Sequence, residues 1–166
     1  MELRGAITIL RSKCLDDAPR EYGWRSSPEL AELDAAIPLS ISYSEFLRLF
    51  GGQIQRPPSG SRGFSIDTAE GVHVGNCMYY DIDTISREAE IGILIGDKRY
   101  WSMGYGYDVM VTLIDHIFSE TSLRRLYLHT LQWNKRAQRC FAKCGFSPLK
   151  RVLRNGNILI HMELFK

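Results

Sequence analysis

Apolar and polar residues alternate through the middle third of the chain, and this pattern predicts three consecutive strands. The runs cover residues 63–69, 72–82 and 88–96. Glu70 and Gly71, between the first two runs, are typical of a hairpin tip. One face of the third run carries Ala89, Ile91, Ile93 and Ile95, and the other carries Glu88, Glu90, Gly92 and Leu94. Because apolar residues lie on both faces, we expect this strand near the centre of a sheet.

The spacing of apolar residues becomes helical over 104 to about 121, which predicts a helix there. Its apolar stripe consists of Val109, Met110, Leu113, Ile114, Ile117 and Phe118. A strand is predicted at 124–131 and another helix at 134–146, with Asn134 as its cap and Gly145 at its end. That second helix directs Ala137, Cys140, Phe141 and Cys144 inward.

A helix is also predicted over 41–52. Its signals are a capping box of Ser42 and Glu45, a hydrophobic staple of Ile41 and Phe46, and a terminating glycine at Gly51 or Gly52. Earlier segments predict a strand at 7–11, a short helix from Asp16 to about Trp24, and a helix or loop over 26–37 with Pro28 in its first turn. Later segments predict a turn-rich linker at 53–63 and a C-terminal hairpin of strands 149–153 and 158–165 around an Asn155-Gly156 turn of type I′.

This order of elements predicts a mixed α/β layered fold, and we expect residues 1–166 to form a single domain. The middle third is antiparallel because its strands are joined by short turns. The strand–helix–strand unit at 88–131 requires a parallel or crossing pair of strands.

Composition and charge narrow the function classes. Basic residues number 21 against 19 acidic ones, a balance that argues against nucleic acid as the main partner. No apolar run is long enough for a membrane span, and the charged N-terminal segment is unlike a signal peptide. The cysteines form no C-x-x-C pair and the histidines supply no zinc spacing, so we expect no metal and four free thiols in a reducing cytoplasm.

The stretch YWSMGYGYD, residues 100–108, places Gly104 and Gly106 at the start of a predicted helix. It fails the test for a Walker loop, because Tyr107 and Asp108 follow the second glycine where Lys and Ser or Thr are needed. It also lacks the third glycine of a dinucleotide fingerprint. A tight turn remains one interpretation. The other is an anion site, since a strand leads into a loop whose bare N–H groups open a helix.

Two blocks of sequence resemble the GNAT superfamily of acetyltransferases. Gly104 and Gly106 match the glycines of its acetyl-CoA loop, Gln/Arg-x-x-Gly-x-Gly/Ala, and Trp101 stands where Gln or Arg is usual. Residues 100–105 look like the YWGKGY of the branch that includes ribosomal-protein N-terminal acetyltransferases. The second block, N-x-x-A-x-x-x-[YF]-x-K-x-G-F, is matched by Asn134, Ala137, Phe141, Lys143, Gly145 and Phe146.

The resemblance implies a mostly antiparallel sheet of about seven strands flanked by about four helices. It implies acetyl-CoA as the donor, held in a gap where the strands at 88–96 and 124–131 splay apart. The cofactor-binding positions that it implies are Ile93, Leu94, Ile95, Trp101, Ser102, Met103, Gly104, Tyr105, Gly106 and Asn134. Ile93, Leu94 and Ile95 would contact the arm of the cofactor through their main chain, and residues 102–106 would hold its pyrophosphate.

The implied chemistry is acyl transfer from a thioester to an amine, which must lose a proton in order to attack. Glu90 is the candidate base and Glu88 the reserve; the alternative for both is a solvated carboxylate on a strand. Many relatives carry a tyrosine acid where this chain has Phe141, which cannot donate a proton. Cys140, Ser147 or a water are the candidates to replace it, and unassisted departure of the thiolate is the alternative. The missing acid leaves open a non-catalytic acyl-CoA-binding or sensing module, and a nucleotide-binding fold is a third alternative.

The acceptor is a primary amine, and a protein N-terminus, a polyamine and an aminoglycoside all remain open. Acidic residues at 81–90 would attract a cationic amine: Asp81, Asp83, Glu88 and Glu90. Four aromatic residues would line an acceptor pocket, pack in the core or form an oligomer interface: Tyr43, Phe46, Tyr79 and Tyr80. A homodimer is one such oligomer.

Overall fold

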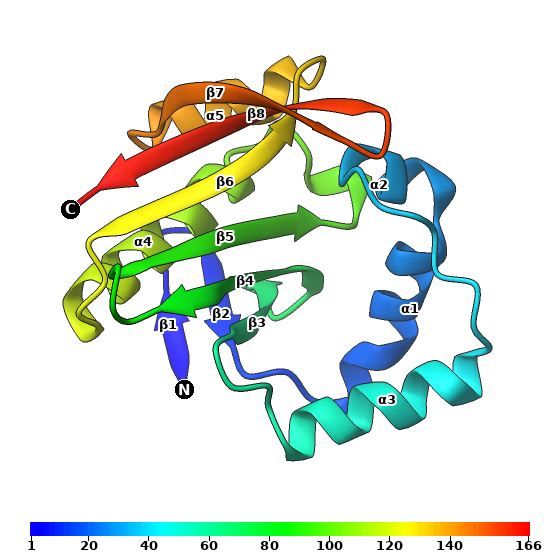
Figure 1. Cartoon of the computed structure of the whole chain (residues 1–166). Coiled ribbons are helices and arrows are strands. Elements are labelled where there is room, and N and C mark those ends of the chain that lie inside the picture. Colours follow the sequence, from blue (N-terminus) through cyan, green and yellow to red (C-terminus); the bar gives the residue numbers. More distant parts are fainter.

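The computed structural model describes all residues, 1–166, and its centre is one sheet of eight strands. In chain order the strands are β1 (Glu2–Arg4), β2 (Thr8–Arg11), β3 (Arg62–Thr68), β4 (His73–Asp83), β5 (Glu88–Ile95), β6 (Arg125–Leu131), β7 (Ser147–Arg154) and β8 (Asn157–Phe165). Their order across the sheet is β1-β2-β3-β4-β5-β6-β8-β7 (Figure 1). Every neighbouring pair is antiparallel except β5 and β6, so the unit at 88–131, for which a parallel or crossing pair was expected, has the parallel one.

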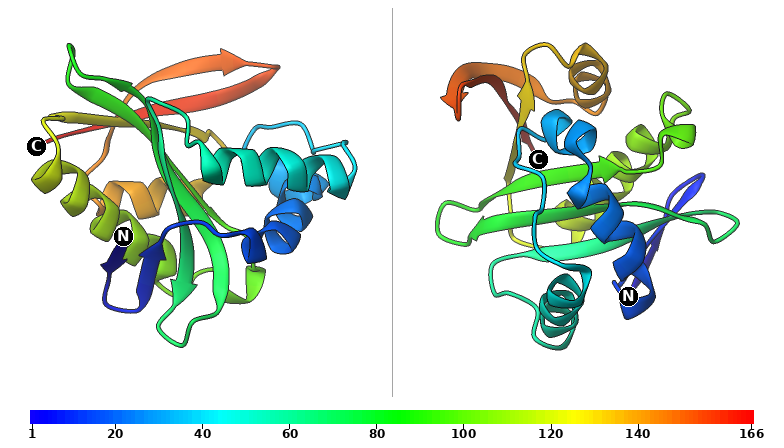
Figure 2. Two further views of the ribbon diagram at one scale, coloured as in Figure 1. Left: turned by 90° about the horizontal axis from the view of Figure 1, so that it is seen from below. Right: turned by 90° about the vertical axis from the view of Figure 1, so that its right-hand side faces the viewer.

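Five α-helices accompany the sheet: α1 (Ala18–Ser26), α2 (Pro28–Leu33), α3 (Tyr43–Gln55), α4 (Tyr105–Glu120) and α5 (Lys135–Lys143). Short 3₁₀ turns occupy Leu15–Asp17 and Lys98–Tyr100. Figure 2 shows α4 and α5 on one side of the sheet and α1, α2 and α3 on the other. The sheet is therefore covered on both faces, as the mixed α/β prediction requires.

The main core lies between the sheet and α4. The helical stripe predicted from the sequence is confirmed, since Val109, Met110, Leu113 and Ile117 are fully buried there. They pack against sheet residues of alternating position, including Leu10, Ile66, Ala89, Ile91, Leu126 and Leu128. Residues between these positions therefore point to the other face of the sheet, toward the side of α1, α2 and α3.

Two element counts differ from the expectation of about seven strands and four helices. The additional strand is β1, whose three residues are too short to show an alternating pattern. The additional helix is α2 within 26–37, where the sequence left helix and loop open. The C-terminal hairpin is confirmed: Asn155 and Gly156 both have positive φ, 49° and 77°, as a type I′ turn demands.

The predicted end of α3 at Gly51 or Gly52 is wrong, because the helix continues to Gln55 and Arg56 is its C-cap. Ile54, in the added turn, packs against the cluster of Ala18, Phe46 and Phe50. The apolar contact of this turn outweighs a helix penalty of about 1 kcal/mol for each glycine. At the other end, Ser42 accepts a hydrogen bond from the Glu45 N–H, whereas the Glu45 carboxylate pairs with Arg48 and leaves the capping box half formed.

Candidate active site

A cleft opens where β5 and β6 stop pairing. The two strands are hydrogen-bonded only where Glu88–Glu90 lies beside Arg125–Tyr127, and beyond these residues they separate. Residues 91–95 line one wall of the resulting cavity and residues 128–131 the other. Its volume of about 480 Å³ is in the range of small-molecule and cofactor sites.

The main chain of β5 directs hydrogen-bonding groups toward this cleft. Gly96 donates its N–H to the Val74 carbonyl, and the register continues from there without a shift as far as Tyr80 opposite Glu90. Main-chain groups in an antiparallel strand alternate between its two neighbours, so Ile91, Ile93 and Ile95 direct theirs away from β4. Leu94 directs its main chain toward β4 and reaches the cleft with its side chain.

The loop after β5 presents a row of N–H groups that form no hydrogen bond within the protein. Residues 102–107 donate none, whereas Trp101 before them donates to Lys98 and Asp108 after them donates to Gly104. Gly104 is the N-cap of α4, has φ +89° and gives no side-chain cap. Free N–H groups and the positive end of a 16-residue helix together favour an anion.

Glycine suits both loop positions for different reasons. At Gly104 the left-handed backbone conformation strains any other residue. At Gly106 a Cβ atom would lie 3.7 Å from the Cys140 Sγ atom, which is ordinary contact, so the protein itself has room for a side chain there. Both glycines line the cavity beside these N–H groups. The cradle thus fits a phosphate group, and the tight-turn interpretation does not account for its unused donors.

Other loop residues take different places. Trp101 donates its indole N–H to the Ile95 carbonyl at 2.7 Å, and the Arg136 guanidinium lies 4.1 Å from its ring centroid. Trp101 therefore fixes the loop to the end of β5. The side chain of Met103 is exposed, and that of Tyr105 packs edge-on against Tyr100, so both contribute to the loop only through their main chain.

The helix α5 borders the cleft beside this loop. Asn134 caps α5, as predicted, by accepting a hydrogen bond from the Ala137 N–H at 3.2 Å, and its side-chain NH₂ forms none within the protein. Arg136, Arg139 and Lys143 line the same end of the cavity and make it basic. Phe141 lines the cavity as well, and no tyrosine replaces it on α5.

Glu90 lies at the closed end of the cleft and is buried, with 8% of its surface exposed. The alternative of a solvated strand carboxylate is therefore wrong for this residue. Its Oε1 atom lies 2.8 Å from the His129 Nδ1 atom, and the Tyr80 phenol is a second hydrogen-bond partner of the carboxylate. Tyr80 lies opposite Glu90 in the sheet register. Burial, and after it the charge of Glu90 and a hydrogen bond to its carboxylate, raise the pKa of Tyr80, so this phenol stays protonated.

The acidic segment expected to attract an amine contributes less than its charge suggests. Asp83 accepts N–H groups of the β4–β5 turn from Ile85 and Ser86, and Glu88 pairs with Arg125 at 2.9 Å. Glu90 alone among the four acids lines the cleft, where Asp34, at the end of α2, accompanies it. Of the four aromatic candidates only Tyr80 lines the cleft; Phe46 and Tyr79 are core residues.

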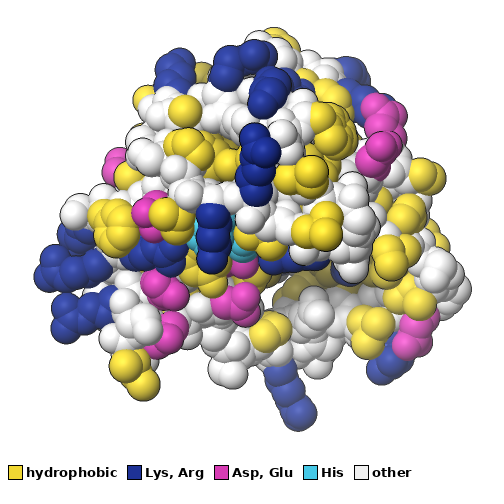
Figure 3. All heavy atoms as spheres, turned by 45° about the horizontal axis from the view of Figure 1, so that its top comes forward, with side chains coloured by type: hydrophobic (Ala, Val, Ile, Leu, Met, Phe, Trp, Pro, Cys, Tyr) yellow, Lys and Arg dark blue, Asp and Glu magenta, His cyan; other side chains and the backbone are white.

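Three polar residues near Glu90 were missed by sequence reasoning: Arg125, His129 and His161. The signal was available in part, since polar residues occupy alternate positions in RLYLHTL of β6 and in IHMEL of β8. Figure 3 shows a face of the molecule on which histidine side chains reach the surface beside basic side chains and above a group of acidic ones. No group of three or more His, Cys, Asp or Glu side chains is arranged to hold a metal ion, and none of the helices has the length and apolar character to cross a membrane. All four cysteines are free thiols.

Comparison with known proteins gives a consistent picture. The model of the acetyltransferase (GNAT) domain matches residues 8–147. The spermidine N(1)-acetyltransferase of Vibrio cholerae is 26% identical over 105 residues, which are 63% of this chain and only 59% of that relative.

Solved structures agree in fold along nearly the whole chain. The Vibrio cholerae spermidine N-acetyltransferase in complex with CoA and spermine superposes with a TM-score of 0.85, at 20% identity and 95% coverage of both chains. A dodecameric structure from the same organism gives 0.76, at 20% identity over 95% of this chain and 93% of that one. An aminoglycoside acetyltransferase in complex with coenzyme A gives 0.76, at 17% identity over 96% of this chain and 95% of that one.

Proposed function

Since the chain belongs to the acetyltransferase (GNAT) domain family, we propose that it transfers the acetyl group of acetyl-CoA to a primary amine. The observation that carries the proposal is the cleft itself, with the free N–H groups of 102–107 at one end and Glu90 at the other. Along β5, Glu90 and Ile95 are about 17 Å apart, at about 3.3 Å for each residue. An extended ligand whose phosphates lie at the loop brings its other end to Glu90.

The two ends of the cleft differ in charge: the end for the phosphates of acetyl-CoA is basic, and the end for the amine is acidic. Arg136, Arg139 and Lys143 stand beside the loop where the phosphates of the donor would bind. Ile93 offers main-chain groups to its arm, Ile95 offers its N–H because its carbonyl is bound by Trp101, and Asn134 offers a side-chain NH₂. At the other end Asp34 and Glu90 favour a cationic acceptor.

Glu90 would act as the base in direct attack on the thioester. The ammonium group first loses one proton to water; the neutral nitrogen then attacks the thioester carbon and gives a second proton to the carboxylate, a C–N bond forms, the C–S bond breaks, and the departing thiolate gains a proton. Phe141 supplies no proton for the last step, so the proton that Glu90 has accepted is available to balance the reaction. A non-catalytic acyl-CoA-binding module would need the same donor site but would have no use for a buried carboxylate at its end.

A polyamine is the acceptor that we favour, because it is a small polycation and the carboxylates of Asp34 and Glu90 both line the cleft. The relatives named for spermidine support this choice. The YWSMGY segment keeps a protein N-terminus as the second candidate, since it resembles the ribosomal-protein branch.

A thiol-release assay with acetyl-CoA tests the proposal on spermidine, spermine, an aminoglycoside and a peptide with a free N-terminus. We expect release with the polyamines and a loss of about 10²–10⁴-fold in kcat for Glu90→Gln with unchanged CoA affinity. Asp83→Asn, a carboxylate change in a turn outside the cleft, is the matched control. Tight CoA binding without thiol release on any amine would establish the binding module instead. Thiol release with the peptide alone would make a protein N-terminus the acceptor in place of a polyamine.

Self-association is a further part of the proposal, since one relative forms a dodecamer. The edge strand β7 is exposed along its length and carries Leu149 and Leu153 at 52% and 75% exposure. A homodimer or larger assembly would cover these residues. Light scattering on the protein as it elutes from a sizing column measures its oligomeric state. A monomer at all concentrations would contradict the proposed self-association.

A further inference from the structure

A chain of hydrogen bonds connects Glu90 to Arg125 through two histidines. The Glu90 Oε1 atom lies 2.8 Å from His129 Nδ1, the His129 Nε2 atom lies 3.0 Å from His161 Nδ1, and the His161 Nε2 atom lies 3.1 Å from an Arg125 terminal nitrogen. Each nitrogen of both imidazoles therefore has one partner. The chain runs from the wall of the cleft to a guanidinium on the same face of the sheet.

The sheet register brings these side chains together. His129 of β6 and His161 of β8 are direct cross-strand partners, and Arg125 and His129 are four residues apart on one face of β6. Tyr127, between them on that face, stacks on the His161 ring at 5.3 Å with an angle of 6°. The His129 and Glu90 side chains are 12% and 10% exposed, so their hydrogen bond is sheltered from water.

The direction of every hydrogen bond follows from Arg125. A guanidinium has only donors, so the His161 Nε2 atom must accept and carries no proton. The proton of neutral His161 is then on Nδ1 and is donated to His129 Nε2, which leaves the His129 proton on Nδ1, facing the Glu90 carboxylate. The guanidinium is itself held by Glu88 and Glu163, each at 2.9 Å.

We propose that Arg125, through His161, fixes the tautomer of His129 so that its Nδ1–H always donates to Glu90 and keeps this carboxylate aimed into the cleft. Arg125, His161 and His129 are positioning residues, and Glu90 is the group that meets the amine. The role of the chain in acetyl transfer rests on the proposed function, whereas the tautomers follow from the geometry alone.

The same arrangement prevents either histidine from taking the proton that Glu90 accepts. A second proton on His161 would stand on Nε2 and face the donors of Arg125. A second proton on His129 would stand on Nε2, so His161 would have to accept it at Nδ1 and carry its own proton on Nε2, again facing Arg125. Burial, then His129 and Arg125, lower the pKa of His161, in agreement with a neutral ring. The charged and titratable groups around the two rings are Tyr80 of β4, Glu88 and Glu90 of β5, Arg125 and Tyr127 of β6, Lys150 of β7 and Glu163 of β8.

Nitrogen-15 NMR of the imidazoles in the full chain, without ligand at pH 7.5, tests the tautomers directly. We expect both His129 and His161 as neutral rings protonated on Nδ1. An Nε2-protonated or cationic ring at either position would overturn the inference. This measurement needs no activity, so its outcome is separate from success or failure of the proposed function.

Variants of Arg125 test the cause. The amide oxygen of Arg125→Gln can accept from His161 Nε2–H, so we expect mixed tautomers and a loss of about tenfold in kcat, the effect of one hydrogen bond to a charged group, with CoA affinity unchanged. Arg125→Lys keeps a donor-only cation and should restore the tautomers and most of the rate. Arg124→Gln, at the exposed neighbouring arginine, is the matched control. Unaltered tautomers in a folded Arg125→Gln protein would overturn the inference.

A second pair of variants covers the case in which Arg125→Gln does not fold. The side-chain NH₂ of His129→Asn can replace Nδ1–H as a donor to Glu90, whereas His129→Leu cannot. We expect the asparagine variant to keep at least tenfold more kcat than the leucine variant, at equal CoA affinity. Equal losses in the two variants would show that His129 acts only by packing and would overturn its positioning role.

Discussion

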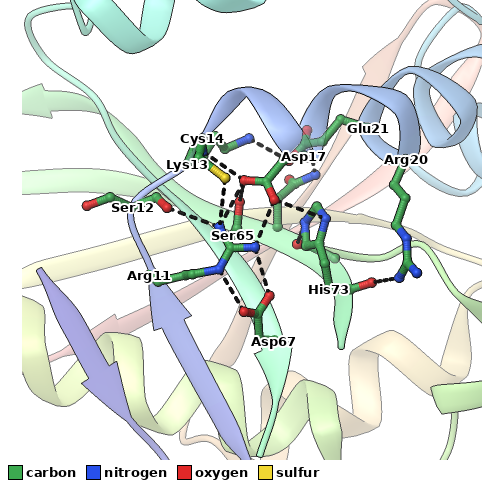
Figure 4. Close-up of polar contacts among 12 residues, drawn as sticks. Arg11, Ser12, Lys13, Cys14, Asp17, Arg20, Glu21, Ser65, Asp67 and His73 are labelled. Atoms are coloured by element: carbon green, nitrogen blue, oxygen red, sulfur yellow. Dashed lines mark hydrogen bonds and ion pairs between the residues drawn. The ribbon is translucent and has the colours of Figure 1, made fainter. Parts of the chain in front are cut away.

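Two histidine–carboxylate pairs lie on the same face of the sheet, and they differ in how many further hydrogen bonds their carboxylates can accept. In the cleft, the hydrogen-bond partners of Glu90 are the His129 ring and the Tyr80 phenol. At the other end of the face, His73 lies 3.4 Å from Asp17, whose carboxylate accepts from Arg11, the Cys14 N–H and the Ser65 hydroxyl (Figure 4).

Each pair belongs to a cluster built around an arginine between two carboxylates. Arg11 bridges Asp17 and Asp67, and Arg125 bridges Glu88 and Glu163. Asp17 stands at the start of α1, which covers its cluster, and 3% of its side chain is exposed. Burial alone would raise the pKa of Asp17, but Arg11, Cys14 and Ser65 hold it well below its ordinary value.

The difference shows that a buried histidine–carboxylate pair is no indication of chemistry by itself. Donors from several directions saturate Asp17, and it does not line the cleft, so it holds α1 against β2 and β3. Glu90 keeps acceptor capacity at a wall that a ligand can reach. The unused hydrogen-bonding capacity, more than burial or charge, separates the reactive candidate from the structural one.

We expect the largest effect from Asp17→Asn, which leaves Arg11 and Asp67 without the second carboxylate of a buried network. The free energy of unfolding should fall by about 3–5 kcal/mol, the usual effect of breaking a buried ion pair. Urea unfolding measures it, and the matched change Glu90→Gln should lower it by less than about 1 kcal/mol, within the range of a single hydrogen bond. Equal losses for the two variants would remove the distinction between the clusters.

Gly106→Val should come next and should act on the cleft alone. The side chain enters space beside the free N–H groups, so CoA should bind at least about tenfold more weakly, equivalent to about 1.4 kcal/mol. Gly104→Val should also weaken binding, with added strain from its left-handed backbone. Calorimetric titration with CoA measures both. Unchanged affinity in a folded Gly106→Val protein would contradict the assignment of the loop to phosphate.

A smaller effect is expected from Ser65→Ala in the covered cluster. Ser65 is fully buried and donates to the Asp17 carboxylate at 2.7 Å. Removing one of several donors should lower the free energy of unfolding by about 1 kcal/mol, because the others still satisfy the carboxylate. A loss as large as that of Asp17→Asn in the same urea experiment would mean that Asp17 is not saturated.

The smallest effect should come from moderate acid. Burial lowers the pKa of His73 and of His161 below the ordinary value of about 6.5, so the folded protein binds fewer protons than the unfolded chain as pH falls through that value. Stability should therefore decline between pH 7.5 and 5.5. Asp17 behaves differently, because its pKa is lowered in the folded protein. Its contribution to the free energy of unfolding persists above about pH 4 and is lost only below that value.

Urea unfolding at the two pH values, on the native chain and on His73→Gln and His161→Gln, assigns this decline to one cluster or the other. Each variant should show a smaller loss of unfolding free energy between pH 7.5 and 5.5 than the native chain. Stability that rises toward pH 5.5 would contradict neutral histidines in both clusters.

Much of the fold was readable from local patterns. The stripe of Val109 to Ile117, the alternation in β5 and the Asn155-Gly156 turn each depend on residues close in sequence, and each was confirmed. The end of α3 was not readable, because contacts of Ile54 with residues of distant segments overrode the local glycine signal. Trp101 was visible as an unusual loop residue, but its bond to the Ile95 carbonyl was not.

The sequence by itself determined the order of elements, the glycine pair at the start of α4 and the candidate carboxylate at Glu90. Only the tertiary structure decided which polar groups meet. The register of β5, β6 and β8 brings Glu90, His129 and His161 into one chain, and the cover of α1 saturates Asp17. These outcomes depend on hydrogen-bond partners between 32 and 48 residues apart, whose directions and distances no local pattern encodes.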